Sequence, residues 1–500
     1  MQMSEQETGC VFTPEKWADF AIERFGLIEK WIDGCTVLDP TMGNGELLLA
    51  MISGALKKGY DIQSLPVQRL YGVEINAKHF ADAIKRLKSL CGANFNPDNF
   101  INDDVLFVQH QIKFDIVFAN PPWVNYSALP DEYKEKIKSE YLKYGLVKSG
   151  ASLLLGNSQV NLAALIIFSV VERMIKDNGE AVLFIPLSLV FHTGAHQAFT
   201  QGKVNSVDFC ISEILDLAET DAFMGISTRF GLMQIFRNKK TTFPLNYFRF
   251  FQDRNEWKRM NVQPLYVPDG PWSVYEDGAK KPTNKKIKIP KKSKPRQGIN
   301  TCGANKIYFF DKCESVDKKR VRIANSSREV IVESSVVYPM VHRTNFKENN
   351  KNIKKWVILP YHSDGKLFSE SDLNGYPLLK KYFHSQRKEL QSRRGKFLGD
   401  KISKGYYWTL LGVGIYNFWP HKIIWEAYGK RDFSPLIFEG DWQAGQALYA
   451  YLAFEDNSIC AKVYQQLLQN DIEKVLNSLQ LGGTMSWAQP GIISNFLEFE

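Results

Sequence analysis

The first half of the chain alternates short apolar runs with longer segments of helical periodicity. The apolar runs have the length of strands, end at an acid or a turn, and lie at residues 36–39, 70–74, 100–104 and 114–119. A short apolar run bounded by turn residues is typical of a buried strand, and strands that alternate with helices form parallel sheets. Up to about residue 240 the pattern therefore predicts an α/β fold with a doubly wound, mostly parallel sheet.

The segment 13–24 is expected to form the first helix. Trp17, Phe20 and Ala21 recur at helical spacing, and Thr13 is a candidate N-cap because its hydroxyl can accept a backbone N–H. The other elements expected in this half are an apolar helix and three strands, at residues 161–177, 181–185, 211–217 and 229–236.

The composition of the chain changes after residue 240. Aromatic and basic residues interleave, the periodicity weakens and turns multiply. A chain of 500 residues exceeds one ordinary domain. We therefore expect two domains, 1–240 and 241–500, the second of mixed α+β structure. In it, residues 382–394 predict a basic helix, which is either a solvated surface helix or a DNA contact, and the tail from Trp442 looks helical.

Glycines and acids follow the first three predicted strands. Gly43 and Gly45 lie between a strand and a helix, where glycine lets the backbone approach a ligand closely. Glu74 ends the next strand, and an acid there can hold ribose hydroxyls. Asp103 and Asp104 end the third. Each acid alone also suits a cap or a turn, but the ordered set predicts one cofactor pocket.

The tetrapeptide Asn120-Pro121-Pro122-Trp123 follows the fourth predicted strand. Its residue types suit methylation of a planar exocyclic amine, whose lone pair is delocalised into the ring. The side-chain oxygen of Asn120 and the carbonyl of Pro121 could accept both amine hydrogens and so localise the lone pair. The prolines stiffen the turn, and Trp123 can stack on a flat base. Taken alone, the tetrapeptide also fits an ordinary proline-rich turn.

Charge and cysteine usage narrow the function classes. The net charge of +9 favours a polyanionic partner, and residues 279–296 carry a run of lysines without an acid. This basic loop is either a solvated linker or a segment that lies along phosphates. The seven cysteines form no C-x-x-C pair and the histidines show no ligand spacing, so no metal site is expected. No membrane span or signal peptide is recognisable, which favours a cytoplasmic protein.

The order of these motifs resembles that of the gamma-class S-adenosylmethionine-dependent DNA methyltransferases, which act mainly on adenine N6. The matching segments are Val11-Phe12-Thr13-Pro14, the Asp39-Pro40-x-x-Gly43-x-Gly45 loop, Glu74, Asp104, Asn120-Pro121-Pro122-Trp123, residues 179–186 and residues 223–229.

The resemblance implies a Rossmann-like methyltransferase sheet, S-adenosylmethionine as cofactor and a flipped-out adenine as substrate. Glu74 would bind the ribose, Asp104 would meet the cofactor adenine, and Phe223 would stack on the flipped base. Asp103 remains an alternative to Asp104, which we prefer because Leu106 follows it at the family spacing. The implied cofactor-binding residues are Phe12, Thr13, Pro14, Asp39, Pro40, Thr41, Gly43, Gly45, Glu74, Ile75 and Asp104, and the implied catalytic residues are Asn120, Pro121, Pro122, Trp123 and Phe223.

The second half resembles the target-recognition region of large adenine methyltransferases from restriction-modification systems. The matching segments are residues 296–305, 337–341, 355–361, 376–379 and 421–425. The resemblance implies duplex DNA as partner, and a restriction endonuclease or defence-system subunit on a separate chain if cleavage accompanies modification. Three alternatives stay open: an RNA adenine methyltransferase, a protein-glutamine methyltransferase, and a non-catalytic DNA-binding subunit.

Overall fold

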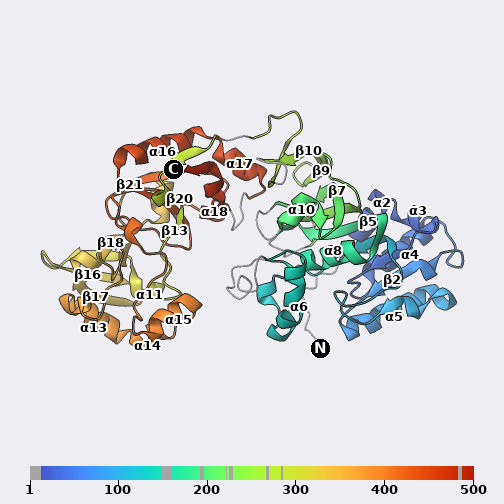
Figure 1. Cartoon of the computed structure of the whole chain (residues 1–500), viewed down its shortest axis with the longest axis horizontal. Helices are drawn as coiled ribbons and strands as arrows, with labels where there is room; N and C mark the ends of the chain where they lie inside the picture. The colour runs from blue at the N-terminus through green and yellow to red at the C-terminus, as the bar shows by residue number, and fades with distance from the viewer. Residues whose placement is uncertain are drawn as a thin grey trace. The chain divides into compact units, whose positions relative to one another are not determined.

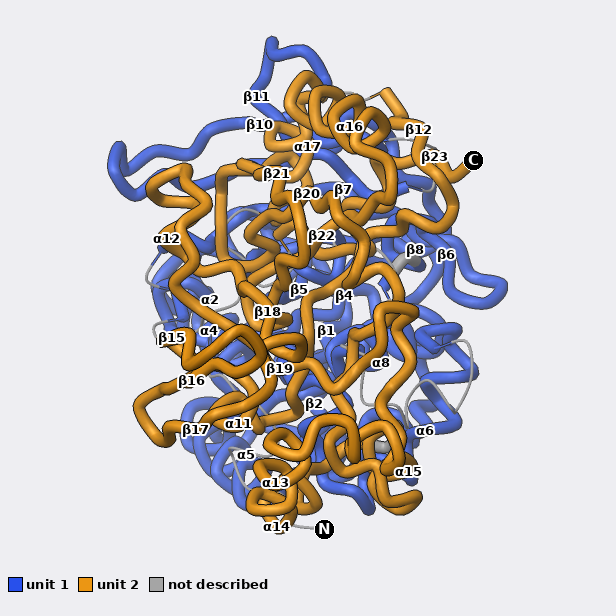
Figure 2. Tube along the Cα trace, turned by 90° about the vertical axis from the view of Figure 1, so that its left-hand side faces the viewer, with its two compact units in different colours: residues 1–281 blue, residues 282–500 orange. Residues whose placement is uncertain are grey.

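The computed structural model of the chain describes residues 13–147, 160–191, 196–220, 222–223, 229–265, 270–282, 285–481 and 487–500 (Figure 1). The chain forms two compact units, residues 1–281 and residues 282–500, which we call unit 1 and unit 2 (Figure 2). No helix in these described ranges is both long and apolar enough to cross a membrane.

Unit 1 is built on one large sheet with the strand order β11-β10-β9-β7-β8-β5-β4-β1-β2-β3. Strands β1 to β5 pair in parallel, and β8 runs antiparallel to both β5 and β7. These strands are β1 (Val37–Asp39), β2 (Leu70–Val73), β3 (Phe100–Ile101), β4 (Phe114–Ala119), β5 (Ile175–Pro186), β7 (Val207–Asp216) and β8 (Phe230–Arg237). The strand order reverses between β1 and β4, which is where open α/β sheets place their ligands. The predicted α/β fold is confirmed.

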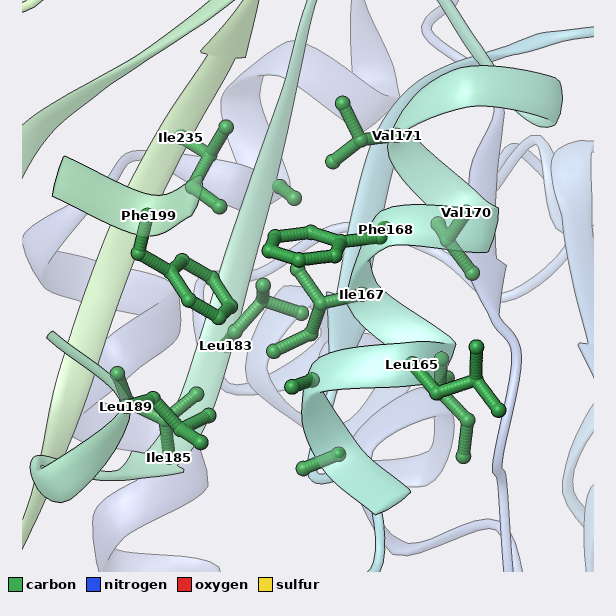
Figure 3. Packing of buried hydrophobic residues seen from close by; sticks show 14 of the residues in the cluster. Leu165, Ile167, Phe168, Val170, Val171, Leu183, Ile185, Leu189, Phe199 and Ile235 are labelled. Carbon is green, nitrogen blue, oxygen red and sulfur yellow. The ribbon is translucent and has the colours of Figure 1, made fainter. Parts of the chain in front are cut away.

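Helices cover both faces of this sheet. The main helices are α2 (Glu15–Arg24), α3 (Leu27–Ile32), α4 (Glu46–Lys57), α5 (Ala77–Cys91), α6 (Asp131–Lys143) and α8 (Leu162–Arg173). Successive residues of β4 point to opposite faces: Val117 packs in the cluster with α6 and α8, whereas Ile116 and Phe118 pack in the cluster with α2 to α5. The most apolar helix, α8, is buried from Leu162 to Val171 and packs against β5 and β8 (Figure 3).

Unit 1 extends beyond the boundary expected at residue 240. Strands β9 (Leu245–Phe251), β10 (Glu256–Pro264) and β11 (Trp272–Glu276) continue the sheet, because β9 pairs in parallel with β7 and the other two follow as antiparallel neighbours. β10 is only partly buried, with Met260 and Val262 as its buried residues, so it lacks the apolar run that marks the buried strands.

Unit 2 is a mixture of small sheets and short helices, as the composition predicted. Its sheets are β13-β22-β20-β21, β14-β19-β18, β15-β16-β17 and the pair β12-β23. The strands are β12 (Ile287–Ile289), β13 (Arg296–Gln297), β14 (Phe309–Phe310), β15 (Lys312–Ser315), β16 (Arg320–Asn325), β17 (Arg328–Glu333), β18 (Val337–Pro339), β19 (Trp356–Ile358), β20 (His421–Glu426), β21 (Leu436–Glu439), β22 (Tyr449–Phe454) and β23 (Leu497–Phe499). The helices include α11 (Asn305–Tyr308), α12 (Arg343–Lys347), α13 (Pro377–Ser385), α14 (Arg387–Gln391), α15 (Lys396–Ser403), α16 (Asn457–Gln469), α17 (Ile472–Ser478) and α18 (Pro490–Ile493).

Three expectations for unit 2 differ from the structure. The helix expected at 382–394 is broken at Gln386. Arg393 is buried rather than solvated, and its guanidinium donates to the carbonyls of Leu390, Thr301 and Tyr407. The tail is not wholly helical: β22 is a strand buried along its whole length, so it shows no alternation in sequence. The basic loop contributes two short strands, β12 and β13, to sheets of unit 2.

Candidate active site

The glycine loop joins β1 to α4 at the carboxyl edge of the sheet. Gly43 and Gly45 have φ values of 54° and 83°, a left-handed backbone that favours glycine. Gly45 is the N-cap of α4, and a Cβ there would lie 3.3 Å from the Cβ of Ala83. Asp39 fixes the start of the loop, because its Oδ1 accepts the N–H of Thr41 at 3.1 Å. The sequence therefore builds a tight loop here, as expected.

Glu74 connects this loop to the end of β2. Its Oε2 accepts the N–H of Gly43 at 2.9 Å, and its Oε1 accepts the N–H of Asn76 at 2.7 Å. Burial raises the pKa of Glu74, and the hydrogen bonds from Asn76 and Gly43 partly offset that rise. Because a carboxylate has further acceptor positions, Glu74 can hold the loop and still accept hydrogen bonds from a ligand.

The two acids after β3 have different surroundings. Asp104 is buried: its Oδ1 accepts the N–H of Leu106, and its Oδ2 accepts from the Tyr133 hydroxyl at 3.2 Å and from Lys136 Nζ at 3.1 Å. Asp103 is exposed and accepts the N–H of Asp104 at 2.7 Å. Tyr133 and Lys136 lie on α6, so this helix fixes Asp104 in place.

Asn120 is positioned by the end of β4 and by Thr13. Its Nδ2 donates to the Thr13 Oγ1 at 3.0 Å, so the orientation of the carboxamide is set by a residue more than a hundred positions earlier. This contact corrects the role expected of Thr13: the N-cap of α2 is Pro14, with no side-chain cap, and the Thr13 hydroxyl supports Asn120 instead.

The aromatic side chains near Asn120 form a cluster. Trp123 lies edge to face with Phe223, with ring centroids 4.8 Å apart, and stacks on Phe230. Its Nε1 donates to the Phe184 carbonyl at 3.3 Å. Phe223 is buried, at 5% exposure. Because the two rings touch, no base fits between Trp123 and Phe223 in this conformation.

A single cavity in unit 1 brings most of these groups together. It has a volume of about 710 Å³ counted to its open mouth, which is in the range of small-molecule sites. The cavity is lined by Pro40, Thr41, Glu74, Ile75, Asn76, His79, Asp103, Asp104, Val105, Asn120, Pro122, Leu129, Tyr133, Leu162 and Ile166. The ends of β1, β2, β3 and β4 thus contribute to one site.

The N-6 DNA methylase family profile matches residues 1–263, more than half of the chain. The chain belongs to the N-6 DNA methylase family. Its activity is that of an adenine-specific DNA methyltransferase, and the matched residues include the whole cavity.

Two curated relatives of this N-6 DNA methylase are Type II methyltransferases. M.BstVI of Geobacillus stearothermophilus is 22% identical over 444 residues, covering 78% of this chain and 73% of the relative. M.VspI of Vibrio sp. (strain 343) is 30% identical over 121 residues, covering 24% of this chain and 26% of the relative.

Two solved structures share the fold of nearly the whole chain. The Type IIL restriction-modification enzyme MmeI in complex with DNA has a TM-score of 0.55 and 14% identity, covering 95% of this chain and 63% of MmeI. A nuclease-deletion mutant of the Type ISP enzyme LlaGI has a TM-score of 0.52 and 12% identity, covering 96% of this chain and 45% of that chain. The chain thus spans less than two thirds of either protein.

The predicted site residues of this methylase fall into three groups. Those that line the cavity are Pro40, Thr41, Glu74, Ile75, Asp104, Asn120 and Pro122. Those that are described but do not line it are Thr13, Pro14, Asp39, Gly43, Gly45, Pro121, Trp123 and Phe223. Of these, Pro121 lines a smaller apolar cavity together with residues of α8. Phe12 and residues 224–228 lie outside the described residues.

Sequence reasoning missed several lining residues. Asn76 and His79 lie just after Glu74 at the start of α5, where the Asn76 side chain caps the helix, so a capping motif could have indicated them. Tyr133 and Leu162 come from α6 and α8. No local signal marks these two, because only the tertiary packing brings their helices to the cavity.

Asp39 gives a prediction about stability. Burial raises the pKa of this carboxyl well above its usual range, and the Glu74 and Glu46 carboxylates add to the rise. An acid whose pKa is raised by folding destabilises the folded protein when it is ionised. This loss of stability begins as the pH rises through the pKa that the group has in the unfolded chain, and it is complete above the pKa of the group in the folded protein. We expect Asp39→Asn, which keeps an acceptor for Thr41, to raise the apo Tm at pH 8 by a few degrees. Thermal melts should show that the gain in Tm shrinks towards pH 4. A gain in Tm that grows on acidification would contradict the raised pKa of Asp39.

Proposed function

We propose that the cavity of unit 1 binds S-adenosylmethionine and that a flipped-out adenine of duplex DNA receives the methyl group beside Asn120. The observation that carries this proposal is that Asn120 lines the same cavity as Glu74 and Asp104. These three side chains come from the ends of three different strands. A substrate-facing amide and cofactor-facing acids therefore open into one space.

The cavity fits the cofactor by its chemistry. The Thr41 hydroxyl oxygen is buried, lines the cavity and has no hydrogen-bond partner among the described residues, so it is available to a ligand. Glu74 would accept hydrogen bonds from ribose hydroxyls, and Asp104, or the exposed Asp103, from the cofactor adenine. The bound cofactor supplies an electrophilic methyl group.

The chain activates the amine by accepting its hydrogens. In the proposed arrangement, the Asn120 side-chain oxygen and the Pro121 carbonyl each accept one N6 hydrogen, which localises the nitrogen lone pair. The hydrogen bond from Asn120 Nδ2 to Thr13 holds the amide in one orientation, so little reorganisation is needed at the moment of reaction.

The aromatic cluster would stack on the flipped base. Extruding a base costs a few kcal/mol, and stacking recovers roughly 1–3 kcal/mol. Since Trp123 and Phe223 now touch, the base stacks on one face of Trp123, or the two rings separate when it enters.

The setting we propose is restriction-modification or phage defence. The similar proteins M.BstVI and MmeI are named as a Type II methyltransferase and a Type IIL restriction-modification enzyme. A separate endonuclease or defence-system subunit would be the partner in such a setting. The order of motifs, with the cofactor loop before Asn120, supports assignment to the gamma class.

The test of the proposed function is transfer of tritium from labelled S-adenosylmethionine. Incubation with duplex DNA, RNA and protein extract separates the open alternatives in one experiment. We expect label in DNA; label only in RNA or in protein glutamine, or no label in any of them, would refute the proposal.

The lysines of residues 279–296 give a second prediction. Lys288 and Lys292 pair with Glu500 and Glu455, whereas Lys285, Lys291 and Lys294 have exposed side chains without an ion pair among the described residues. The unpaired lysines are therefore the ones available to phosphates. We expect changing these three to Gln to weaken binding to all DNA sequences about equally and to flatten the slope of log K against log salt by about one per lost contact.

The matched control is the double variant Lys288→Gln/Lys292→Gln. These charges are already balanced within unit 2, so the slope should change less than in the triple variant. Fluorescence anisotropy over a series of salt concentrations measures both slopes, and sequencing of modified bases reads the methylated site. An equal slope in the wild type and the triple variant, or a changed methylation site, would contradict the assignment.

A further inference from the structure

A groove in unit 2 brings together segments that are far apart in sequence. Its lining consists of residues 299–301, Gly303, Asn305, Phe309, residues 340–343, Lys355, Tyr428 and residues 445–449. Its volume, about 1180 Å³ counted to its open mouth, exceeds the usual range of small-ligand pockets. Much of its lining comes from the stretches of unit 2 whose role the methyl-transfer site does not explain.

Backbone hydrogen bonds join two of the segments that line the groove. Ile299 donates its N–H to the Ala444 carbonyl at 2.7 Å, and Gln446 donates its N–H back to the Ile299 carbonyl at 3.0 Å. Gly298 is required beside this contact, because a Cβ there would lie 2.3 Å from the Ala444 oxygen. The backbone at Ile299, next to the lining residue Asn300, is therefore held by hydrogen bonds through both its N–H and its carbonyl.

The amide side chains in the groove are pre-oriented by one hydrogen bond each. The Asn300 Oδ1 accepts the N–H of Cys302 at 2.7 Å, and the Asn305 Oδ1 accepts from the Thr301 hydroxyl at 2.5 Å. Gln446 Nε2 donates to the Gln297 side chain at 2.9 Å. Each amide retains further donor or acceptor positions for a ligand. Side chains held in this way recognise a ligand with little loss of entropy.

The charge of the groove is positive. Its lining contains Arg343, Lys355 and His342 but no Asp or Glu. Arg343 is exposed and has no ion pair among the described residues, and the only carboxylate paired with Lys355 there is Asp311, at 3.9 Å. Burial and the neighbouring cations lower the pKa of His342, which is consistent with a positive field. An anionic partner is therefore favoured.

We propose that this groove is the base-recognition site of unit 2, where Asn300, Asn305 and Gln446 contact base edges of duplex DNA. Arg343 and Lys355 contact the flanking phosphates. Amides form paired hydrogen bonds with adenine, and cations at the rim bind the backbone. This inference rests on the proposed function, since it takes the partner to be the DNA that is methylated.

The test compares four variant proteins. Asn300→Asp keeps the acceptor for Cys302 and removes the amide donor; Gln446→Leu removes the polar group at similar size. We expect each to lose on the order of tenfold discrimination at one position of the methylated sequence. Arg343→Gln/Lys355→Gln should keep the sequence, weaken DNA binding several-fold and flatten the salt slope. Gln391→Leu/Lys351→Gln, exposed positions outside the groove lining, is the control and should change nothing.

The readouts are sequencing of N6-methyladenine sites and anisotropy with a labelled duplex, on full-length protein with an unchanged Tm and unchanged cofactor affinity. The proposal is overturned if Asn300→Asp and Gln446→Leu both methylate the wild-type sequence and Arg343→Gln/Lys355→Gln binds DNA with unchanged affinity. We call the first two the amide variants and the third the cation variant. If one amide variant fails to fold, the other and the cation variant decide. If the wild type transfers no methyl group to DNA, the proposed function fails separately, and unchanged duplex affinity in the cation variant still overturns the groove assignment.

Discussion

Asn120→Ala is expected to lower methyl transfer to DNA by at least about a hundredfold, while the affinity for S-adenosylmethionine stays within a few-fold. Removing one pre-oriented polar group that acts on the transition state typically costs this much. The cofactor affinity should persist, because the glycine loop and Glu74 are held by contacts that do not involve Asn120. Single-turnover transfer and calorimetric titration measure the two quantities.

Two further variants make this experiment specific. Asn125→Ala removes an exposed asparagine from the same loop and should be neutral. Thr13→Val removes the acceptor that orients Asn120, so we expect an intermediate loss of methyl transfer, on the order of tenfold. Near wild-type transfer by the Asn120→Ala protein would show that the reacting amine lies elsewhere.

Glu74→Ala is expected to weaken S-adenosylmethionine binding by at least about tenfold. The substitution removes the proposed acceptors for the ribose and also the carboxylate that holds the Gly43 N–H, so the loop loses a contact on the cofactor side. Hydrogen bonds to a charged group contribute roughly 1.5–3 kcal/mol each, which makes a tenfold loss the lower bound. Calorimetric titration measures the affinity directly.

The matched control for Glu74 is Glu23→Ala, an exposed glutamate on α2 that does not line the cavity. It should bind the cofactor as the wild type does. Equal affinity in the Glu74→Ala protein and in its control would exclude the cavity of unit 1 as the cofactor site.

The central part of the fold could be predicted because local signals agree with the tertiary arrangement. Strands β1, β2 and β4 are apolar runs that end in glycine, acid or proline, and such ends meet at one edge of a parallel sheet. That is why Glu74 and Asp104, distant in sequence, were expected to share one cofactor pocket. Both line one cavity, and Asn120 lines the same cavity.

The remaining features depend on contacts that no local pattern marks. The support of Asn120 by Thr13 and the fixing of Asp104 by Tyr133 and Lys136 each join elements that only the folded chain brings together. Unit 1 extends further than expected because β10 is only partly buried and its sequence carries little apolar signal. β22 was not predicted because it is buried on both faces. Its sequence therefore lacks the alternation of apolar and polar residues that marks a half-buried strand.

The most direct test of the account is the identity of the methylated atom. DNA from a methylation-free host that expresses the wild-type chain or its Asn120→Ala variant would be digested to nucleosides and analysed by mass spectrometry. We predict N6-methyladenine with the wild type and none above background with the variant. Absence of N6-methyladenine with the wild type, or its undiminished presence with the variant, would contradict the proposed site and mechanism.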